Sequence, residues 1–322
     1  MSNKIIIVAG DPNSINSEII YKTWKHLDKT TKNKIYLIAS FKLFEHQFKK
    51  LKKKIYLSKV NNLMSRDKSN SLKVIDIPVK FENPFNVSKS EATKYLSKCL
   101  NLAHRLSESN RVKGFINCPI NKRLISKSRK VGLTEYLASK CKIYDKSEVM
   151  LIHNKKFSVV PLTTHINVKT ISKKITSDLI VTKLITLNNE FKKLFKIKPK
   201  IGVLGLNPHN GELNHGSEEV TKIIPAIIKL KKKGLNIYGP LVSDTAFVSS
   251  YKDYDVIVGM YHDQVLTPFK TLFHFDAINI TLGLNYLRVS PDHGPAVDLI
   301  GKNKANYLSL LRCIKFISST NR

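Results

Sequence analysis

Short apolar runs alternate with longer amphipathic stretches along this chain, and this alternation limits its fold more strongly than any other feature. The runs are rich in Ile, Val and Leu and are bounded by polar residues, as buried strands are. We predict strands at Lys4–Ala9, Lys34–Ala39, Ser71–Pro78, Gly114–Cys118, Glu148–His153, Phe157–Thr163, Lys200–Leu206, Asp255–Tyr261 and Ala277–Leu282. We predict helices at Ser17–Leu27, Lys89–Ser107, Val168–Leu194, Ser217–Lys233 and Ala305–Ser319, of which Val168–Leu194 is either one long helix or two fused ones. Strands that alternate with helices predict an α/β fold with mostly parallel sheets.

The length of 322 residues allows one large domain or two lobes. No internal repeat and no Gly/Ser-rich linker is present, so two lobes would pack through a shared cleft. No apolar run approaches the roughly 18 residues of a membrane span, and the first residues, "MSNKIIIVAG", enter a strand without the layout of a signal peptide. We therefore expect a cytoplasmic protein without a membrane partner. The four cysteines contain no CxxC pair and are expected to be reduced and mostly buried.

The formal net charge of +31 raises the question of a nucleic-acid partner. Only eight of the 55 basic residues are Arg, and the lysines are spread along the whole chain. Sites for nucleic acid usually combine Arg with aromatic stacking platforms, and the sequence contains no such cluster. We therefore predict no nucleic-acid partner, although the charge would attract a phosphorylated substrate.

The segment "VAGDPNSINSE" lies between the first strand and the first helix, where a Rossmann fold carries its GxGxxG turn. It contains a single glycine, Gly10. The dinucleotide fingerprint is therefore absent, and a nicotinamide cofactor would have to be bound in another way.

Three predicted strands end in a histidine. "SVVPLTTH" ends at His165, "IGVLGLNPH" at His209 and "DVIVGMYH" at His262, and Asp263 follows the last of them. The carboxyl ends of parallel strands are where α/β folds gather their ligand sites. Three imidazoles are typical of a catalytic zinc site and also suit cobalt or manganese. From spacing alone, the alternative is that each histidine is a hydrogen-bonded cleft residue.

Further polar residues concentrate in the last third of the chain. Lys270 lies eight residues after His262, Asn279 interrupts the apolar run "AINITLGL", and Arg288 is one of the few arginines. Buried Asn and Arg side chains cost free energy unless they have partners. A strand bulge would explain Asn279 and a structural ion pair would explain Arg288; near a metal, both would instead bind an anionic substrate. Asp244, in "GPLVSDTAF", is a candidate general base, and an Asp before Thr is also a common helix N-cap.

The motifs "GLNPHNGE", "MYHDQVLTPFK", "NITLGL" and "RVSPDHGPA", with "TTH" and "NCPINK" upstream, resemble those of the 4-hydroxythreonine-4-phosphate dehydrogenase family, in the same order and over nearly the whole chain. The resemblance implies homodimers of two-lobed α/β/α subunits with an isocitrate/isopropylmalate dehydrogenase-like fold. The first lobe would comprise residues 1–135 and about 265–322. Residues of about 136–264 would form the metal-binding, dimer-forming lobe, and the active site would lie in the cleft and draw on both subunits.

The same resemblance implies the roles of individual residues. A divalent metal, with zinc first and cobalt, magnesium or manganese as alternatives, would be bound by His165, His209 and His262. Substrate would be bound by Thr134, Lys270, Asn279 and Arg288. NAD or NADP would lie against Asp292, His293 and Gly294, which agrees with the missing GxGxxG motif.

The implied reaction is the metal- and NAD-dependent oxidation of 4-phosphooxy-L-threonine to 2-amino-3-oxo-4-phosphooxybutanoate. This product decarboxylates to 3-amino-2-oxopropyl phosphate, in pyridoxine 5'-phosphate biosynthesis. Two positions depart from the family pattern. Leu133 stands where the family has a substrate-binding His, and the loop Gly10–Glu18 lacks the two later glycines and the proline. Because of Leu133, an alternative activity remains open: the protein would be a related dehydrogenase of another 4-phosphorylated hydroxy acid, of the threonate or erythronate phosphate type.

Overall fold

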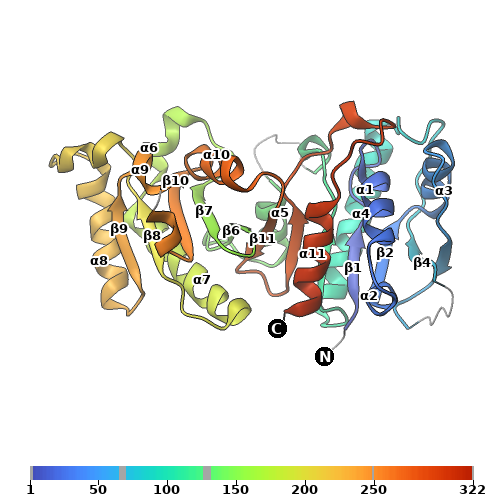
Figure 1. Ribbon diagram of the computed structural model, residues 1–322, viewed down its shortest axis with the longest axis horizontal. Helices are drawn as coiled ribbons and strands as arrows, with labels where there is room; N and C mark the ends of the chain where they lie inside the picture. The colour runs from blue at the N-terminus through green and yellow to red at the C-terminus, as the bar shows by residue number, and fades with distance from the viewer. Residues whose placement is uncertain (1–2, 65–69, 126–131, 249, 321–322) are drawn as a thin grey trace. The chain divides into compact units, whose positions relative to one another are not determined.

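The chain crosses twice between two units, each of which contains six of the described strands. The computed structural model describes residues 3–64, 70–125, 132–248 and 250–320 (Figure 1). Unit 1 contains the chain up to Leu133 together with Asn285–Thr320, and unit 2 contains Thr134–Leu284. The first crossing falls where the sequence analysis placed it to within a few residues. The second lies at Leu284 rather than near residue 265, because α10 (His262–Phe273) and β11 (Ile278–Leu282) pack on strands of unit 2.

The strands of unit 1 are all parallel, in the order β3-β4-β2-β1-β5-β12. Their bounds are β1 Ile5–Val8, β2 Ile35–Ala39, β3 Leu57–Val60, β4 Leu72–Asp76, β5 Gly114–Asn117 and β12 Arg288–Pro291. The central strands β1 and β2 are buried along their whole length, which is why they read as continuous apolar runs and not as alternating ones.

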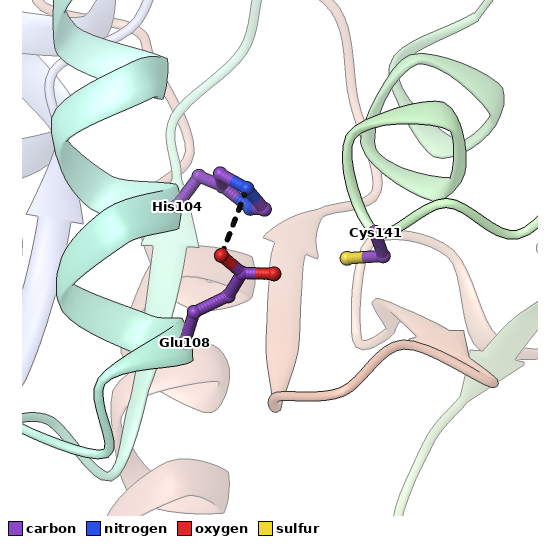
Figure 2. Close-up of side chains that lie close together, drawn as sticks. All are labelled: His104, Glu108 and Cys141. Atoms are coloured by element: carbon purple, nitrogen blue, oxygen red, sulfur yellow. Dashed lines mark ion pairs between the residues drawn. The ribbon is translucent and has the colours of Figure 1, made fainter.

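The helices of unit 1 are α1 (Asn16–Lys25), α2 (Lys29–Lys34), α3 (Phe41–Lys50), α4 (Lys89–Glu108) and α11 (Leu308–Ser319). Helices α1 and α11, from opposite ends of the chain, pack side by side (Figure 1). Near the end of α4, His104 Nε2 is 3.3 Å from Glu108 Oε2 on the same helix (Figure 2). Its Nδ1 is 3.0 Å from the Tyr286 hydroxyl. This second contact attaches α4 to the segment that leads into β12.

The strands of unit 2 follow the order β11-β6-β7-β10-β8-β9. Their bounds are β6 Val149–His153, β7 Ser158–Thr163, β8 Ile201–Leu204, β9 Ile237–Leu241, β10 Val256–Tyr261 and β11 Ile278–Leu282. The four strands from β7 to β9 are parallel neighbours, whereas β6 pairs antiparallel with both β7 and β11. The carboxyl ends of β7, β10 and β8 therefore lie at one edge of the sheet.

The helices of unit 2 are α5 (Leu133–Lys140), α6 (Ile171–Lys174), α7 (Ser177–Phe195), α8 (Ile224–Lys232), α9 (Ser243–Ala246) and α10. The predicted helix Val168–Leu194 is interrupted at Ile175 and Thr176. Thr176 has extended backbone, and its hydroxyl accepts a hydrogen bond from Leu179 N at 3.1 Å. It thus acts as the N-cap of α7, and the periodic apolar positions continue across the break.

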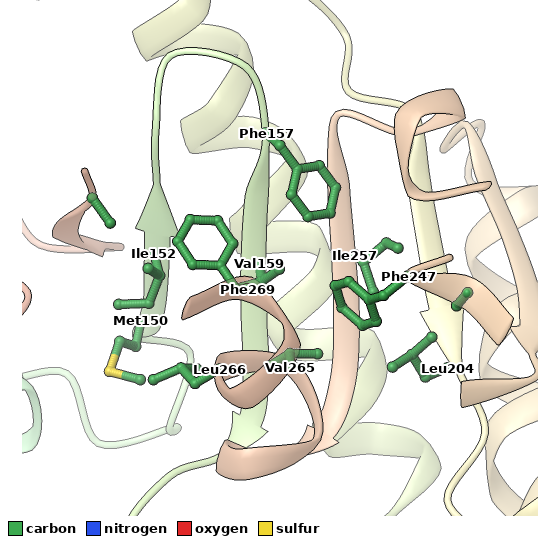
Figure 3. Close-up of a cluster of buried hydrophobic side chains, with 12 residues drawn as sticks. Met150, Ile152, Phe157, Val159, Leu204, Phe247, Ile257, Val265, Leu266 and Phe269 are labelled. Carbon is green, nitrogen blue, oxygen red and sulfur yellow. The ribbon is translucent and has the colours of Figure 1, made fainter. Parts of the chain in front are cut away.

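Helix α10 covers one face of unit 2 with three buried apolar side chains, Val265, Leu266 and Phe269 (Figure 3). They pack with Phe157 and Val159 of the β6–β7 region and with Ile257 of β10. This cluster fixes α10 against the strands that carry the predicted metal ligands.

All nine predicted strands are present, so the expectation of a mostly parallel α/β fold is confirmed. The sequence analysis missed the strands β3, β9 and β12 and the helices α2, α3, α5, α9 and α10. All four cysteines are buried and outside any disulfide bond, as expected. Within the described ranges, no helix is both long and apolar enough to cross a bilayer.

Candidate metal and substrate site

Two of the three predicted metal ligands lie together at the carboxyl edge of unit 2. His165 follows the end of β7 by two residues, and His262 follows β10 directly as the first residue of α10. Because β7 and β10 are parallel and paired, both chain segments leave the sheet at the same edge. The ring centroids of His165 and His262 are 5.7 Å apart, with 41° between the ring planes.

This separation is close to the value expected for two ligands of one metal ion. With metal–nitrogen bonds of about 2.0–2.1 Å and a tetrahedral angle, the centroids of two ligating rings are separated by roughly 5 Å. Both imidazoles reach solvent: His165 is exposed, and the His262 side chain is 31% exposed. His262 Nδ1 is 3.4 Å from Asp263 Oδ1, so the carboxylate lies beside the ring.

His209 lies in a turn of unusual conformation after β8. The five residues His209–Leu213 all have positive φ, between 49° and 61°. Such left-handed backbone costs about 1–2 kcal/mol for each non-glycine residue, and Gly211 and Asn210 are the types that tolerate it best. The turn leaves the His209 side chain exposed to solvent.

A buried carboxylate holds the base of this turn. Glu219 is fully buried, and its Oε1 accepts hydrogen bonds from Leu206 N at 2.7 Å and Asn207 N at 2.8 Å. Its Oε2 accepts a third bond, from Asn207 Nδ2 at 2.9 Å. Burial works to raise the pKa of Glu219, but the bonds from Asn207 and Leu206 together leave it below its ordinary value. Neighbouring Glu218 accepts bonds from Ser172 and Asn207, which lower its pKa to about 2.

The described part of one chain does not bring His209 to the other two histidines. No group of three His, Cys, Asp or Glu side chains in that part includes His209 with all ligand atoms within 4.8 Å of one another. A single chain thus assembles His165 with His262 and presents His209 to solvent on a separate turn.

The predicted substrate residues divide between the two units. Thr134 is the second residue of α5, Lys270 lies in the last turn of α10 and Asn279 lies in β11, all in unit 2. The Oδ1 atom of Asn279 is buried and has no hydrogen-bond donor within the described residues. A buried acceptor without a donor costs free energy, and a bound ligand would supply that donor.

Arg288 lies in unit 1 and is almost completely buried, at 3% exposure. It begins β12, opposite Phe115 of β5, and its Nε donates to Oδ1 of the buried Asn117 at 2.7 Å. Asn117 belongs to the "NCPINK" motif, so two of the motifs noted in the sequence meet at this bond.

The predicted cofactor residues follow β12 directly. Asp292 N donates to the Ser309 hydroxyl at 3.0 Å, which attaches the segment to α11, and His293 Nδ1 is 3.0 Å from Gly294 O. Asp244, the candidate general base, lies in α9 of unit 2 and is exposed.

In the loop Gly10–Glu18, which departs from the family pattern, polar side chains form hydrogen bonds with the backbone. Gly10 has φ of 78°, whereas Ser14 and Asn16 have no positive φ. The Ser14 hydroxyl donates to Asp11 O at 2.6 Å, and Asn16 Nδ2 donates to Pro119 O at 2.8 Å. Asp11 accepts bonds from backbone amides, and burial raises its pKa.

Several residues of this region had no role in the sequence analysis. Glu219, Asn117 and Gln264 each bind segments that carry predicted site residues. Glu135, beside Thr134, accepts a hydrogen bond from the Thr164 hydroxyl at 3.0 Å and so ties α5 to the segment of His165. Asn117 and Gln264 lie within the quoted motifs and Glu135 directly follows the predicted substrate residue Thr134, which are the signals that could have found them.

Comparisons with known proteins agree with the resemblance inferred from the motifs. The chain is 37% identical to the 4-hydroxythreonine-4-phosphate dehydrogenase of Aquifex aeolicus over 326 aligned positions, which cover 98% of each chain. It is 30% identical to the D-threonate 4-phosphate dehydrogenase of Salmonella typhimurium, with 97% of each chain covered.

Solved structures agree as well. The fold matches the crystal structure of 4-hydroxythreonine-4-phosphate dehydrogenase from Klebsiella pneumoniae with a TM-score of 0.84, 27% identity and 98% coverage of each chain. A β-decarboxylating dehydrogenase from Thermococcus kodakarensis shares the fold at a TM-score of 0.50 and 11% identity, covering 96% of this chain and 80% of that one. The predicted fold class is therefore confirmed. The sequence pattern of the pyridoxal phosphate biosynthetic protein PdxA matches residues 30–317, and the chain thus belongs to the PdxA family.

Proposed function

We propose that this protein is an NAD(P)- and metal-dependent dehydrogenase that oxidises 4-phosphooxy-L-threonine to 2-amino-3-oxo-4-phosphooxybutanoate. The β-keto acid product then loses CO2 to give 3-amino-2-oxopropyl phosphate. The observation that carries the proposal is the pair of imidazoles, His165 and His262, at the carboxyl ends of two paired parallel strands. The full-length similarity to 4-hydroxythreonine-4-phosphate dehydrogenases supports the choice of substrate.

His165, His209 and His262 would hold a divalent metal ion, and zinc suits three imidazoles best. When bound, the ion supplies Lewis acidity that makes the substrate hydroxyl easier to deprotonate. Asp244 is the candidate acceptor for the hydroxyl proton. Asp263, 3.4 Å from the Nδ1 atom of His262, would keep that ring in one orientation.

Four residues would bind the substrate. Lys270 and Arg288 carry the positive charges that suit the phosphate and the carboxylate. Thr134 offers a hydroxyl, and Asn279 offers the buried acceptor that has no donor in the described structure. Since Asn117 binds Nε of Arg288, the guanidinium is held in one orientation before any substrate arrives.

The nicotinamide cofactor, NAD or NADP, would lie against Asp292, His293 and Gly294. When bound, it would supply a hydride acceptor for the carbon that bears the hydroxyl. The hydrogen bond from Asp292 N to the Ser309 hydroxyl, on α11, would hold this segment in place without a glycine-rich turn.

We further propose a homodimer in which His209 of the partner subunit completes each metal centre. Within the described chain His209 does not join His165 and His262, and its turn exposes it. Exposed apolar side chains follow both segments: Ile166 and Val168 are 39% and 74% exposed after His165, and Leu213 is 54% exposed after His209. Such side chains favour burial against a second copy.

The second candidate is a dehydrogenase of threonate or erythronate 4-phosphate. Leu133, in place of the family's substrate-binding His, favours it, because an apolar side chain removes one polar contact to the substrate. The similarity to D-threonate 4-phosphate dehydrogenase also favours it, although at lower identity.

The test is NAD and NADP reduction with each of the three phosphorylated substrates, before and after chelation and with added zinc, cobalt, manganese or magnesium. We expect turnover of 4-phosphooxy-L-threonine that chelation abolishes and metal restores. His165→Ala and His262→Ala should lose metal and activity together, whereas His46→Ala, at an exposed position on α3 of unit 1, should keep both. Full metal occupancy and turnover in His262→Ala would overturn the proposed centre, and faster turnover of a threonate phosphate would favour the second candidate.

The shared centre has its own test. Inactive His209→Ala and inactive His262→Ala subunits are mixed after dissociation. If the partner supplies His209, mixed dimers regain one intact site, and an equimolar mixture recovers about a quarter of wild-type activity. No recovery, with mixed dimers shown to form, would mean that each chain supplies all its own ligands.

A further inference from the structure

We infer that Gln264 is a positioning residue that fixes, through one amide group, the three segments carrying His262, His209 and Asp244. This inference deepens the proposed function, because it concerns the residues proposed to bind the metal. Gln264 lies in the first turn of α10, two residues after His262.

The Gln264 amide makes hydrogen bonds at both of its ends. Its Oε1 accepts a bond from Met260 N, at 2.6 Å, near the end of β10. Its Nε2 donates to Gly205 O at 2.7 Å, just past β8, and to Ser243 Oγ at 2.8 Å, in α9. The NH2 group can donate two hydrogen bonds, and both are used.

Each of these partners is close in sequence to a residue of the proposed centre. Met260 is two residues before His262, Ser243 is directly before Asp244, and Gly205 begins the segment that leads to His209. Glu219 clamps the next two residues of that segment, Leu206 and Asn207, through their backbone amides. The segment is thus fixed from both sides before it enters the left-handed turn.

The Gln264 side chain packs closely against Gly259, which has no side chain of its own. A Cβ atom added at Gly259 would lie 2.9 Å from Gln264 Oε1 and 2.5 Å from Val265 Cγ1. Gln264 itself is only partly exposed. The next two residues of α10, Val265 and Leu266, are buried in the core beneath the helix (Figure 3).

Only glutamine supplies these contacts from this place. Glutamate would turn two acceptor oxygens toward a carbonyl and a hydroxyl, and so would keep the bond from Met260 but lose the bond to Gly205. Methionine would fill a similar volume and lose all three bonds. In the proposed dimer, one amide would thereby support a ligand of its own metal centre and the histidine offered to the partner subunit.

The test uses Co²⁺ as the probe, because its visible absorption spectrum reports on ligand geometry. The full-length variants are Gln264→Met, Gln264→Glu, Ser243→Ala and the matched control Gln47→Met. Gln47 is a buried glutamine in unit 1 whose Nε2 also donates to two acceptors, Pro12 O at 2.9 Å and Pro84 O at 2.7 Å. Co²⁺ titration, the absorption spectrum and thermal unfolding are measured for each variant.

We expect Gln264→Met to weaken Co²⁺ binding about 10- to 100-fold and to change the absorption bands, as the loss of groups that orient metal ligands does elsewhere. Gln264→Glu and Ser243→Ala should weaken it less. Gln47→Met should lower the melting temperature and leave the Co²⁺ affinity and spectrum unchanged.

The outcomes separate this inference from the proposed function. If wild type binds Co²⁺ and His262→Ala does not, but Gln264→Met binds it with unchanged affinity and spectrum, Gln264 is merely structural and the inference is wrong. If Gln264→Met does not fold, Gln264→Glu and Ser243→Ala decide in the same way. If wild type binds no Co²⁺, the proposed metal centre fails first and the inference fails with it.

Discussion

Arg288 and Asn117 are joined by a 2.7 Å hydrogen bond from Nε to Oδ1, and both side chains are at most 3% exposed. The bond fixes the guanidinium of a residue proposed to bind substrate, so removing it should affect both stability and substrate binding. We predict that Asn117→Ala lowers the free energy of unfolding by about 1.5–3 kcal/mol, the range for hydrogen bonds to charged groups. It should also raise the KM for substrate without changing the Kd for NAD. Urea unfolding, steady-state kinetics and cofactor titration measure these three quantities. Asn117→Asp, which keeps the acceptor, should be milder; an equal loss of substrate and NAD binding would indicate a purely structural arginine.

Glu219→Gln should loosen the turn that carries His209. Glutamine has one acceptor where the carboxylate has two, so at least one of the three bonds from Leu206 and Asn207 is lost inside the protein. We expect a loss of about 1–3 kcal/mol of unfolding free energy and faster amide exchange over residues 206–213, measured by hydrogen–deuterium exchange. The control is Glu190→Gln on α7, where the carboxylate pairs with the largely exposed Lys193 at 2.7 Å. Its cost should stay within about 1 kcal/mol, and similar exchange in both variants would contradict the role given to Glu219.

Gly10→Ala and Gly234→Ala form a matched pair. Both glycines have nearly the same φ, 78° and 80°. A Cβ atom added at Gly10 would lie 2.6 Å from Pro119 O and 2.8 Å from Cys118 O, whereas a Cβ atom added at Gly234 would have no atom within 4 Å. We expect Gly234→Ala to cost about 1–2 kcal/mol for the left-handed conformation. Gly10→Ala should cost a further 1–3 kcal/mol, approximately, because backbone must move. Chemical denaturation of the two variants measures the difference; equal costs would mean that the loop Gly10–Glu18 relaxes freely.

His153 should make unit 2 less stable in mild acid. Burial lowers the pKa of His153 from 6.5 to about 4, with the ring against Phe195 and 2.8 Å from the Ser158 hydroxyl. The unfolded chain therefore takes up a proton below about pH 6.5 that the folded chain refuses until about pH 4. The stabilisation is complete above pH 6.5 and is lost as the pH falls to 4, by up to about 3 kcal/mol. Urea unfolding between pH 4 and pH 8 measures it, and His153→Gln should reduce this slope; an unchanged slope would show that other groups cause it.

The fold of this protein could be predicted from its sequence wherever local pattern decides the structure. Buried parallel strands such as β1 and β2 have continuous apolar runs, and the predicted strands that lead to His165 and His262 are parallel neighbours. The break at Thr176 was missed because the apolar positions keep helical spacing on both sides of it. Helix α10 was missed because "HDQVLTPFK" contains Pro268 and begins with polar residues.

The residue types of the candidate site could be proposed from the sequence, but the contacts between those residues could not. The contacts of Gln264 with Gly205 and Ser243 join residues 59 and 21 positions apart, and no periodicity encodes such pairs. Nor does the spacing of the histidines indicate that His165 and His262 meet in one chain while His209 stays apart. Left-handed backbone at His209 depends on the buried bonds of Glu219, which only the folded chain forms.

Helix α10 begins at His262 and includes Lys270, so a single helix carries both residues. Eight residues at about 1.5 Å each place their Cα atoms roughly 12 Å apart along its axis, and helical side chains lean back toward the amino end. In the proposed site, α10 would therefore fix the distance between the metal ligand His262 and the substrate-binding residue Lys270. With the proposed roles of His262 and Lys270, the hydroxyl and the anionic end of the substrate would have to lie a set distance apart, so the backbone of α10 would select the chain length of the substrate. A one-residue insertion before Lys270 would turn its side chain by about 100° around the helix axis.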